Sequence, residues 1–209
     1  MKKILIIILV FVLYIFNNVK VNSNTFYSES GILMNIDNLE VIASKNENKK
    51  HLTASIAKIM TCIVAIEEKP LDIVVEITKE DLEQEGSKIY LKENEKVYLK
   101  DLLYGLMLRS GNDAANAIAR IISGSHLEFS KLMNKLAHKI GMKNSEFNNP
   151  SGLDRDTKNY STAYDMALLM SYCYNNPIFM EINNTVSYRF KSLDNNTYSY
   201  FNKHRLIQK

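Results

Sequence analysis

The segment from His51 to Thr61 most constrains the fold of this chain, because Ser55 precedes Lys58 there by three residues among apolar neighbours. The apolar pattern that continues from it predicts a helix over residues 54–68. Residues three apart lie on the same face of a helix, so the hydroxyl and the amine would touch. The fold therefore has to bring this serine and this lysine together at the start of a helix.

A serine and a lysine in contact have the properties of an activated nucleophile. Burial disfavours the charged form of a lysine, and Ile56 and Ile59 could supply the apolar wall that this requires. If Thr53 or Ser55 caps the helix, the backbone N–H of Ser55 points toward the oxyanion that forms at an attacked carbonyl. Ser55 as nucleophile and Lys58 as base predict acyl transfer. The alternative is a chance occurrence of this spacing on an ordinary helix.

A second motif, Ser110-Gly-Asn112, separates two apolar periodic segments that predict paired helices. Gly111 would supply a permissive backbone, and Asn112 or Asp113 would cap the second helix, which by itself explains many such loops. In the functional interpretation, Ser110 shuttles a proton between Lys58 and the leaving group. The Asn112 amide would bind the substrate's peptide and orient Lys58. The two motifs together are more specific than either one.

The chain resembles the serine-type D-Ala-D-Ala carboxypeptidases, which are low-molecular-mass penicillin-binding proteins. Asn159 stands where many members carry histidine, and Ile56-Ala57 replaces a more usual polar pair, but neither departure changes the nucleophile or the base. Besides the two motifs, the segments similar to the family are Gly31–Asp37 with Glu40–Lys45, Leu103–Ala115, Asn149–Leu153 and Tyr160–Ala167.

The resemblance implies an α+β fold of the penicillin-binding-protein and β-lactamase type, with a helical lobe beside an antiparallel sheet. It also implies that Ser55 attacks the carbonyl between the terminal D-alanines of a peptidoglycan stem peptide while Lys58 accepts its proton. Ser110 would relay a proton to the departing amine, Asn112 would position the peptide, and water would release the acyl group. β-Lactam antibiotics would acylate the same serine as inhibitors, and no cofactor is implied.

The family's third motif, a Lys-Thr-Gly triplet or a variant of it, does not occur in the 209 residues. Residues 202–207 resemble the sequence that shortly precedes it, so the resemblance implies a truncated domain over residues 24–209 with an incomplete sheet. An unpaired sheet edge predicts poor stability, and the loss of one oxyanion-hole donor alone costs about a hundred- to a thousandfold in rate. The alternatives are a catalytically dead remnant, an incomplete gene model, or a class A β-lactamase, for which no matching glutamate motif follows Asn112.

Residues 1–23 are typical of a signal peptide, because Met1-Lys-Lys3 precedes an apolar stretch from Ile4 to Phe16. That stretch is shorter than the roughly 20 residues of a membrane-spanning helix. We expect cleavage after Ser23, and the alternative is an uncleaved anchor that associates with the membrane. Both place the rest of the chain outside the cytoplasm, at the outer face of the membrane or in the cell wall.

Composition excludes some other classes of protein. The formal net charge is only +3, and the charged residues are interspersed, which does not indicate a nucleic-acid surface. Cys62 and Cys173 lie in apolar helical runs and are predicted to be buried free thiols. The four histidines lack metal-ligand spacing, so no metal site is predicted.

The remaining periodicity predicts one domain of mixed helices and strands. The expected elements are a hairpin at about 31–45, a strand-rich segment over 73–98 with a small hairpin of 88–92 and 96–100, a helix over 127–140, a helix capped by Ser161 or Thr162 that reaches Tyr174, and a hairpin of 185–190 with 197–201.

Overall fold

The computed structural model describes residues 27–204, so the expected signal peptide lies outside the described residues. The chain divides into two compact units, of which the first ends at Glu47 and the second begins at Asn48. In the first unit, β1 (Gly31–Met34) pairs antiparallel with β2 (Val41–Lys45), with an irregular register between Leu33 and Met34. This pair confirms the expected opening hairpin.

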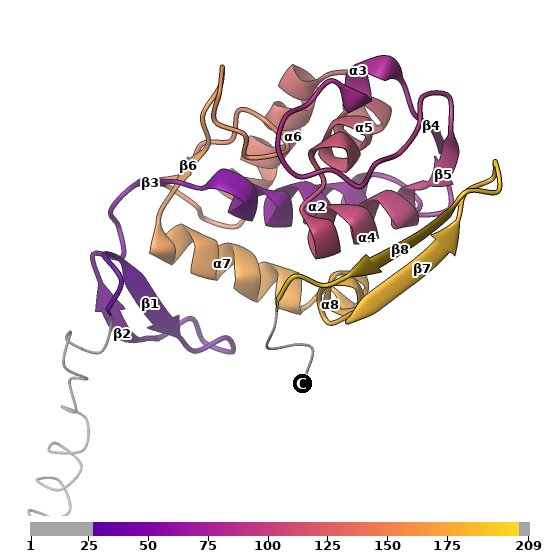
Figure 1. The fold of residues 1–209 in the computed structure, drawn as a ribbon. Helices are drawn as coiled ribbons and strands as arrows, with labels where there is room; N and C mark the ends of the chain where they lie inside the picture. The colour runs from indigo at the N-terminus through magenta and orange to yellow at the C-terminus, as the bar shows by residue number, and fades with distance from the viewer. Residues whose placement is uncertain (1–26, 205–209) are drawn as a thin grey trace, which may run out of the picture. The chain divides into compact units, whose positions relative to one another are not determined.

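Helix α2 (Lys58–Glu68) is the central helix of the second unit (Figure 1). Every residue from Met60 to Ala65 is buried, as expected of a helix that is covered on all sides. The helices that pack against it are α4 (Leu99–Arg109), α5 (Asn112–Ser123), α6 (His126–Lys139), α7 (Ala163–Tyr174) and α8 (Pro177–Asn183).

The two cysteines belong to this packed core. Cys62 on α2 and Cys173 on α7 are fully buried free thiols, which confirms the prediction made for them. Burial raises the pKa of both thiols, to about 12 for Cys173. Both side chains therefore act as small apolar groups.

Side-chain caps explain where two of the helices begin. The Oγ of Ser125 accepts a hydrogen bond from the Glu128 N–H at the start of α6, and the Oγ1 of Thr162 accepts one from the Asp165 N–H at the start of α7. Helix α6 is followed by Gly141, which has a φ of +87°. The helices predicted over 127–140 and up to Tyr174 are therefore confirmed.

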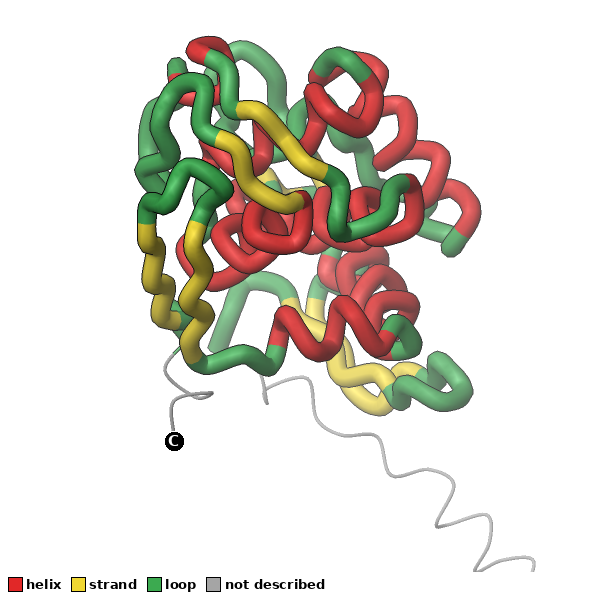
Figure 2. Tube along the Cα trace, turned by 90° about the vertical axis from the view of Figure 1, so that its right-hand side faces the viewer, coloured by secondary structure: helices red, strands yellow, loops and turns green. Residues whose placement is uncertain are grey.

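The described strands form four separate antiparallel pairs rather than one sheet (Figure 2). A short helix, α3 (Lys79–Leu82), lies in the sequence between β4 (Val74–Glu76) and β5 (Lys96–Tyr98). The α+β class is confirmed, and so is the hairpin predicted for 185–201. Besides β1–β2, the pairs are β3 (His51–Leu52) with β6 (Tyr160–Ser161), β4 (Val74–Glu76) with β5 (Lys96–Tyr98), and β7 (Ser187–Lys191) with β8 (Thr197–Phe201).

The small hairpin predicted for residues 88–92 and 96–100 is wrong. The N–H groups of Ile89 and Tyr90 donate to the buried Asp113 carboxylate, each at 3.0 Å, and Tyr90 has a φ of 63°. A carboxylate therefore satisfies the donors that a neighbouring strand would otherwise satisfy. Strand β5 pairs with β4 instead, and Leu99 already belongs to α4.

Tyrosines hold the β7–β8 hairpin against the helices. The ring of Tyr188 stacks on Tyr104 with centroids 3.6 Å apart, and its hydroxyl donates to Asp101 at 2.6 Å. The hydroxyl of Tyr198 donates to Glu95 at 2.6 Å. Both tyrosines therefore pack the hairpin, and each one also satisfies a carboxylate.

The loop between α6 and β6 returns to the chain just before α2. Gly152 in this loop has a φ of +72°, and a Cβ at this position would overlap the Ala54 carbonyl group. Ala54 itself has a φ of 45°, which is uncommon for a residue with a side chain. The two backbones thus interlock, and the loop fixes the turn that carries Ser55.

We expect Gly152→Ala to destabilise the protein by about 3 kcal/mol or more, because it adds a backbone overlap to an unfavourable φ. Gly124→Ala is the matched control, since Gly124 has a φ of +81° but nothing lies within 4 Å of the position that a Cβ would take there. It should cost only about 1 kcal/mol, for the left-handed backbone conformation alone. Urea unfolding measures both, and equal losses would contradict the interlocked arrangement.

Candidate active site

Ser55 and Lys58 lie where a tight turn runs into the central helix. Ser55 is exposed on a 3₁₀ turn, Ala54–Ala57, and Lys58 begins α2 with only 3% of its surface exposed. The Nζ of Lys58 donates to the Oγ of Ser55 at 3.2 Å. The structure therefore places an accessible hydroxyl against a buried amine.

The expected side-chain cap at this helix start is wrong. Thr53 precedes the turn with φ −80° and ψ −23°, and it makes no capping hydrogen bond. A capping side chain needs an extended backbone at its own residue to reach the free N–H groups. The Thr53 hydroxyl is instead buried, and it has no hydrogen-bond partner in the part of the chain that the structure describes.

The Lys58 amine is surrounded by three oxygen atoms from three segments of the chain. Besides Ser55, its Nζ donates to the Asn112 Oδ1 at 2.8 Å and to the Ser151 carbonyl oxygen at 2.5 Å. These contacts match the three N–H donors of an ammonium group. Burial, assisted by the positive charge of Lys203 and opposed by Asp113, lowers the pKa of Lys58 from 10.5 to about 8.

The two charges that act on Lys58 are held in different ways. Asp113 is fully buried, and burial raises the pKa of its carboxyl group while hydrogen bonds from backbone N–H groups oppose the shift. Lys203 follows β8, its N–H donates to the Leu108 carbonyl at 3.2 Å, and its Nζ donates to the Ser87 Oγ at 3.2 Å. The negative charge of Asp113 is therefore buried under the site, and the positive charge of Lys203 is held at the edge of the site.

The corner between α4 and α5 carries the second motif. The predicted paired helices are confirmed, but Ser110, not Gly111, takes the left-handed conformation, with a φ of 60°. Gly111 has an ordinary φ of −65° and precedes the first helical residue, Asn112, so the predicted cap at Asn112 or Asp113 is wrong. Gly111 is needed for space, since a Cβ would lie 2.8 Å from Ile89.

The structure brings Asn112 to Lys58 and leaves the Ser110 hydroxyl without a hydrogen bond among the described residues. The Asn112 Nδ2 donates to the Glu85 carbonyl oxygen at 2.6 Å, so both ends of this amide have protein partners. Nδ2 carries two hydrogens, so a second donor is left for a substrate peptide beside the contact with Glu85. Ser110 is half-buried beside it and makes no side-chain hydrogen bond with residues 27–204.

Sequence reasoning missed the loop that supplies the third oxygen around Lys58. The Asn149 Oδ1 accepts hydrogen bonds from the N–H groups of Ser151, at 3.2 Å, and Gly152, at 2.7 Å. The fully buried Asn159 accepts from the Asn149 N–H at 3.0 Å and donates to its carbonyl at 2.9 Å. The cluster of turn-forming residues at Asn149-Pro-Ser-Gly152 was the available signal.

Within residues 27–204, no group of three or more His, Cys, Asp and Glu side chains is arranged to hold a metal ion. None of the helices described in that range is long and apolar enough to cross a membrane.

Comparisons with known proteins agree with this geometry. A family model described as D-alanyl-D-alanine carboxypeptidase matches residues 17–209. The carboxypeptidase DacF of Bacillus subtilis is 38% identical over 147 residues, which are 68% of this chain and 38% of DacF. The match therefore covers less than half of the length of DacF.

Two solved structures show the same fold. A D-alanyl-D-alanine carboxypeptidase from Mycobacterium tuberculosis has a TM-score of 0.85 at 28% identity, covering 92% of this chain and 72% of that one. Penicillin binding protein 6B from Escherichia coli has a TM-score of 0.81 at 25% identity, covering 92% and 62%. The match over residues 17–209 and these likenesses show that the chain belongs to the D-alanyl-D-alanine carboxypeptidase family.

Proposed function

We propose that this chain forms an acyl-enzyme on Ser55 and acts as a serine-type D-Ala-D-Ala carboxypeptidase. The observation that carries the proposal is the buried Lys58 amine, which lies 3.2 Å from the exposed Ser55 hydroxyl and has a pKa lowered to about 8. A serine hydroxyl is a weak nucleophile until an adjacent base removes its proton. Lys58 is the base in this proposal.

The reaction has two steps. The Ser55 oxygen bonds to the carbonyl carbon between the terminal D-alanines of a stem peptide, and its proton passes to Lys58. The carbon–nitrogen bond then breaks, and the departing amine of D-alanine takes a proton relayed from Lys58 through the Ser110 hydroxyl. Among the described residues Lys58 and this hydroxyl share no hydrogen bond, so the relay requires the hydroxyl to turn toward the amine. Water hydrolyses the resulting ester with Lys58 again as base, which restores Ser55. Asn112 keeps Lys58 aimed at Ser55 and binds the peptide.

The lowered pKa makes this base effective near neutrality. With a pKa of about 8, about a tenth of the Lys58 amine is neutral at pH 7, against less than about a thousandth at an ordinary lysine pKa of 10.5. The fraction of the Lys58 amine in the neutral, reactive form at pH 7 is therefore more than about a hundredfold larger. A general base works best when its pKa lies near the working pH.

The substrate proposed here is a peptidoglycan stem peptide that ends in D-Ala-D-Ala. The support comes from the relatives, whose names describe D-alanyl-D-alanine carboxypeptidases and a penicillin binding protein. β-Lactams would form the same ester with Ser55 and hydrolyse slowly. Such a substrate lies outside the cytoplasm, so we infer an exported protein.

A fluorescent penicillin tests the proposed nucleophile. We expect covalent labelling of the full chain and complete loss of labelling in Ser55→Ala, because no other hydroxyl contacts the Lys58 amine among the described residues. Gel fluorescence after denaturation measures the bound label.

Ser199→Ala is the matched control, since Ser199 is an exposed serine on β8, and it should label as the parent does. Labelling that persists in Ser55→Ala, or its absence from a folded parent, would refute the nucleophile. Rapid release of the label, with fast turnover of a cephalosporin, would favour the β-lactamase alternative.

The rate of acylation should rise with pH and level off above about pH 8, as Lys58 loses its proton. Lys203→Ala removes a positive charge that lowers the pKa of Lys58, so the same profile should move to higher pH and the rate at pH 7 should fall. Second-order labelling rates between pH 6 and 10 measure the shift.

Lys191→Ala removes the same charge from an exposed position on β7 and should leave the profile in place. An unchanged profile in Lys203→Ala would show that this charge does not act on Lys58. An equal shift in both variants would point to net charge alone.

A further inference from the structure

Thr61 lies on the same face of α2 as Lys58, three residues further along the helix. Its side chain is fully buried, and its hydroxyl donates a hydrogen bond to the Pro150 carbonyl oxygen at 2.7 Å. A threonine hydroxyl within a helix can bond to a carbonyl group of the preceding turn instead. The Thr61 hydroxyl thus joins α2 to a distant loop, and none of the reaction steps proposed above uses it.

The contact that Thr61 makes lies next to the contact that Lys58 makes with the same loop. Lys58 donates to the Ser151 carbonyl oxygen, and Thr61 donates to the carbonyl oxygen of the residue before it, Pro150. Among the described residues, these two are the only hydrogen bonds between α2 and the loop of residues 148–157. Apart from Lys58 itself, Thr61 is therefore the group through which α2 holds the Ser151 carbonyl by a hydrogen bond.

The position of the Ser151 carbonyl oxygen matters most when Lys58 is neutral. An ammonium group has three N–H donors, whereas a neutral amine has two N–H donors and one lone pair. To act as a base, the amine has to aim its lone pair at the Ser55 hydroxyl. Its two N–H groups then remain for the Asn112 Oδ1 and the Ser151 carbonyl oxygen. The positions of these two acceptors therefore set the direction of the lone pair.

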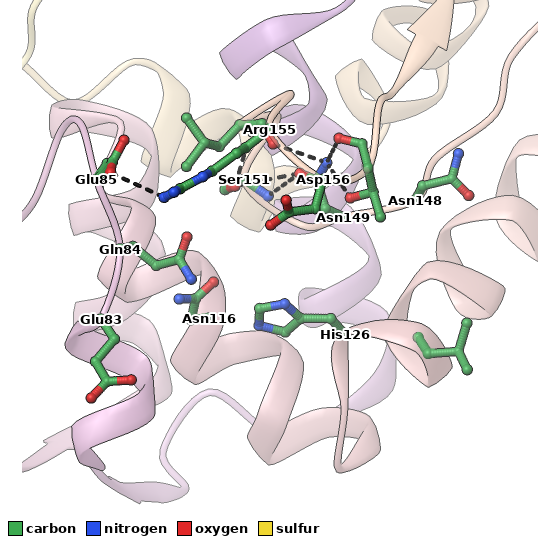
Figure 3. Close-up of a pocket in the computed structure, with 13 residues that line it drawn as sticks. Glu83, Gln84, Glu85, Asn116, His126, Asn148, Asn149, Ser151, Arg155 and Asp156 are labelled. Atoms are coloured by element: carbon green, nitrogen blue, oxygen red, sulfur yellow. Dashed lines mark hydrogen bonds and ion pairs between the residues drawn. The ribbon is translucent and has the colours of Figure 1, made fainter.

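The loop needs Thr61 to keep the Ser151 carbonyl in place. Figure 3, a view of a cavity that this loop lines, shows Asn149 bonded to Ser151 within the loop itself. Without the Thr61 hydroxyl, the buried Pro150 carbonyl would lose its donor from α2, and a buried carbonyl without a partner is costly. The loop would then shift, and a displacement of about 1 Å can change a rate by about a hundredfold.

We propose that Thr61 is a positioning residue, which holds the Ser151 carbonyl oxygen where it directs the Lys58 amine toward Ser55. The inference deepens the proposed function and rests on it in taking Lys58 as the base. Thr61 acts through the loop and through Lys58, and it exchanges no proton with the substrate.

The protonation of Lys58 tests the proposal without any acylation. Thr61→Val keeps the size of the side chain and removes the hydroxyl, so the Ser151 carbonyl should no longer be held against the ammonium form. The charged groups that act on Lys58, which are Asp113 on α5 and Lys203 after β8, are unchanged in this variant. We expect the pKa of Lys58 to fall by about half a unit to one unit, because its charged form loses hydrogen bonding.

NMR titration of isotope-labelled lysine side chains in the full chain measures this pKa, and Lys58→Met identifies the resonance. Thr61→Ala also lacks the donor and should lower the pKa as Thr61→Val does, whereas Thr61→Ser keeps the hydroxyl and should keep the parent value. Ile63→Val is the control for lost stability, since it trims a fully buried residue of α2 without removing a hydrogen bond. It should leave the pKa unchanged.

An unchanged or raised pKa in the two variants without the hydroxyl would overturn the proposal. So would an equal fall in Thr61→Ser or in Ile63→Val.

Penicillin acylation at about pH 9.5, where most of Lys58 is neutral, gives the second readout. Thr61→Val and Thr61→Ala should acylate about tenfold more slowly than the parent, and Thr61→Ser should restore most of the rate. Equal rates in all variants would contradict a role in aiming the amine. A parent that takes no label would refute the proposed function, and the titration would still decide whether Thr61 positions Lys58.

Discussion

The burial of one lysine amine is the constraint on which the rest of the site depends. Lys58 begins the central helix, and its amine is held by oxygen atoms of Ser55, Asn112 and Ser151. These residues come from the turn before α2, from the start of α5 and from the loop before β6. A single ammonium group thus joins three parts of the second unit, and each part has to fold correctly for the amine to be positioned.

This arrangement has an energetic cost that also makes the lysine reactive. A pKa that falls from 10.5 to about 8 corresponds to about 3 kcal/mol against the charged form of Lys58 in the folded state. The unfolded chain binds this proton more tightly, so the contribution of Lys58 to stability improves as pH rises from about 8 to 10.5. The buried Lys58 therefore destabilises the folded state near neutral pH, and the same pKa shift makes its amine a usable base.

Part of the fold could be predicted from periodicity, because helices such as α6 and α7 bury residues at helical spacing. The prediction failed at Ile89 and Tyr90, whose N–H groups bond to the Asp113 side chain from a distant helix. Of the site, the contact between Ser55 and Lys58 follows from local spacing. The Ser151 carbonyl could not be predicted in this way, because its place depends on side-chain hydrogen bonds within a loop that has no periodicity.

The interlocked backbones of Ala54 and Gly152 make the reactive serine part of a loop as well as of a helix. The loop contributes few of the large buried side chains, which lie mostly on the helices. Opening of the loop would therefore free the turn that holds Ser55 while most of the core stayed packed. We expect loss of reactivity and loss of the folded core to be separate events in this chain, with inactivation as the earlier one.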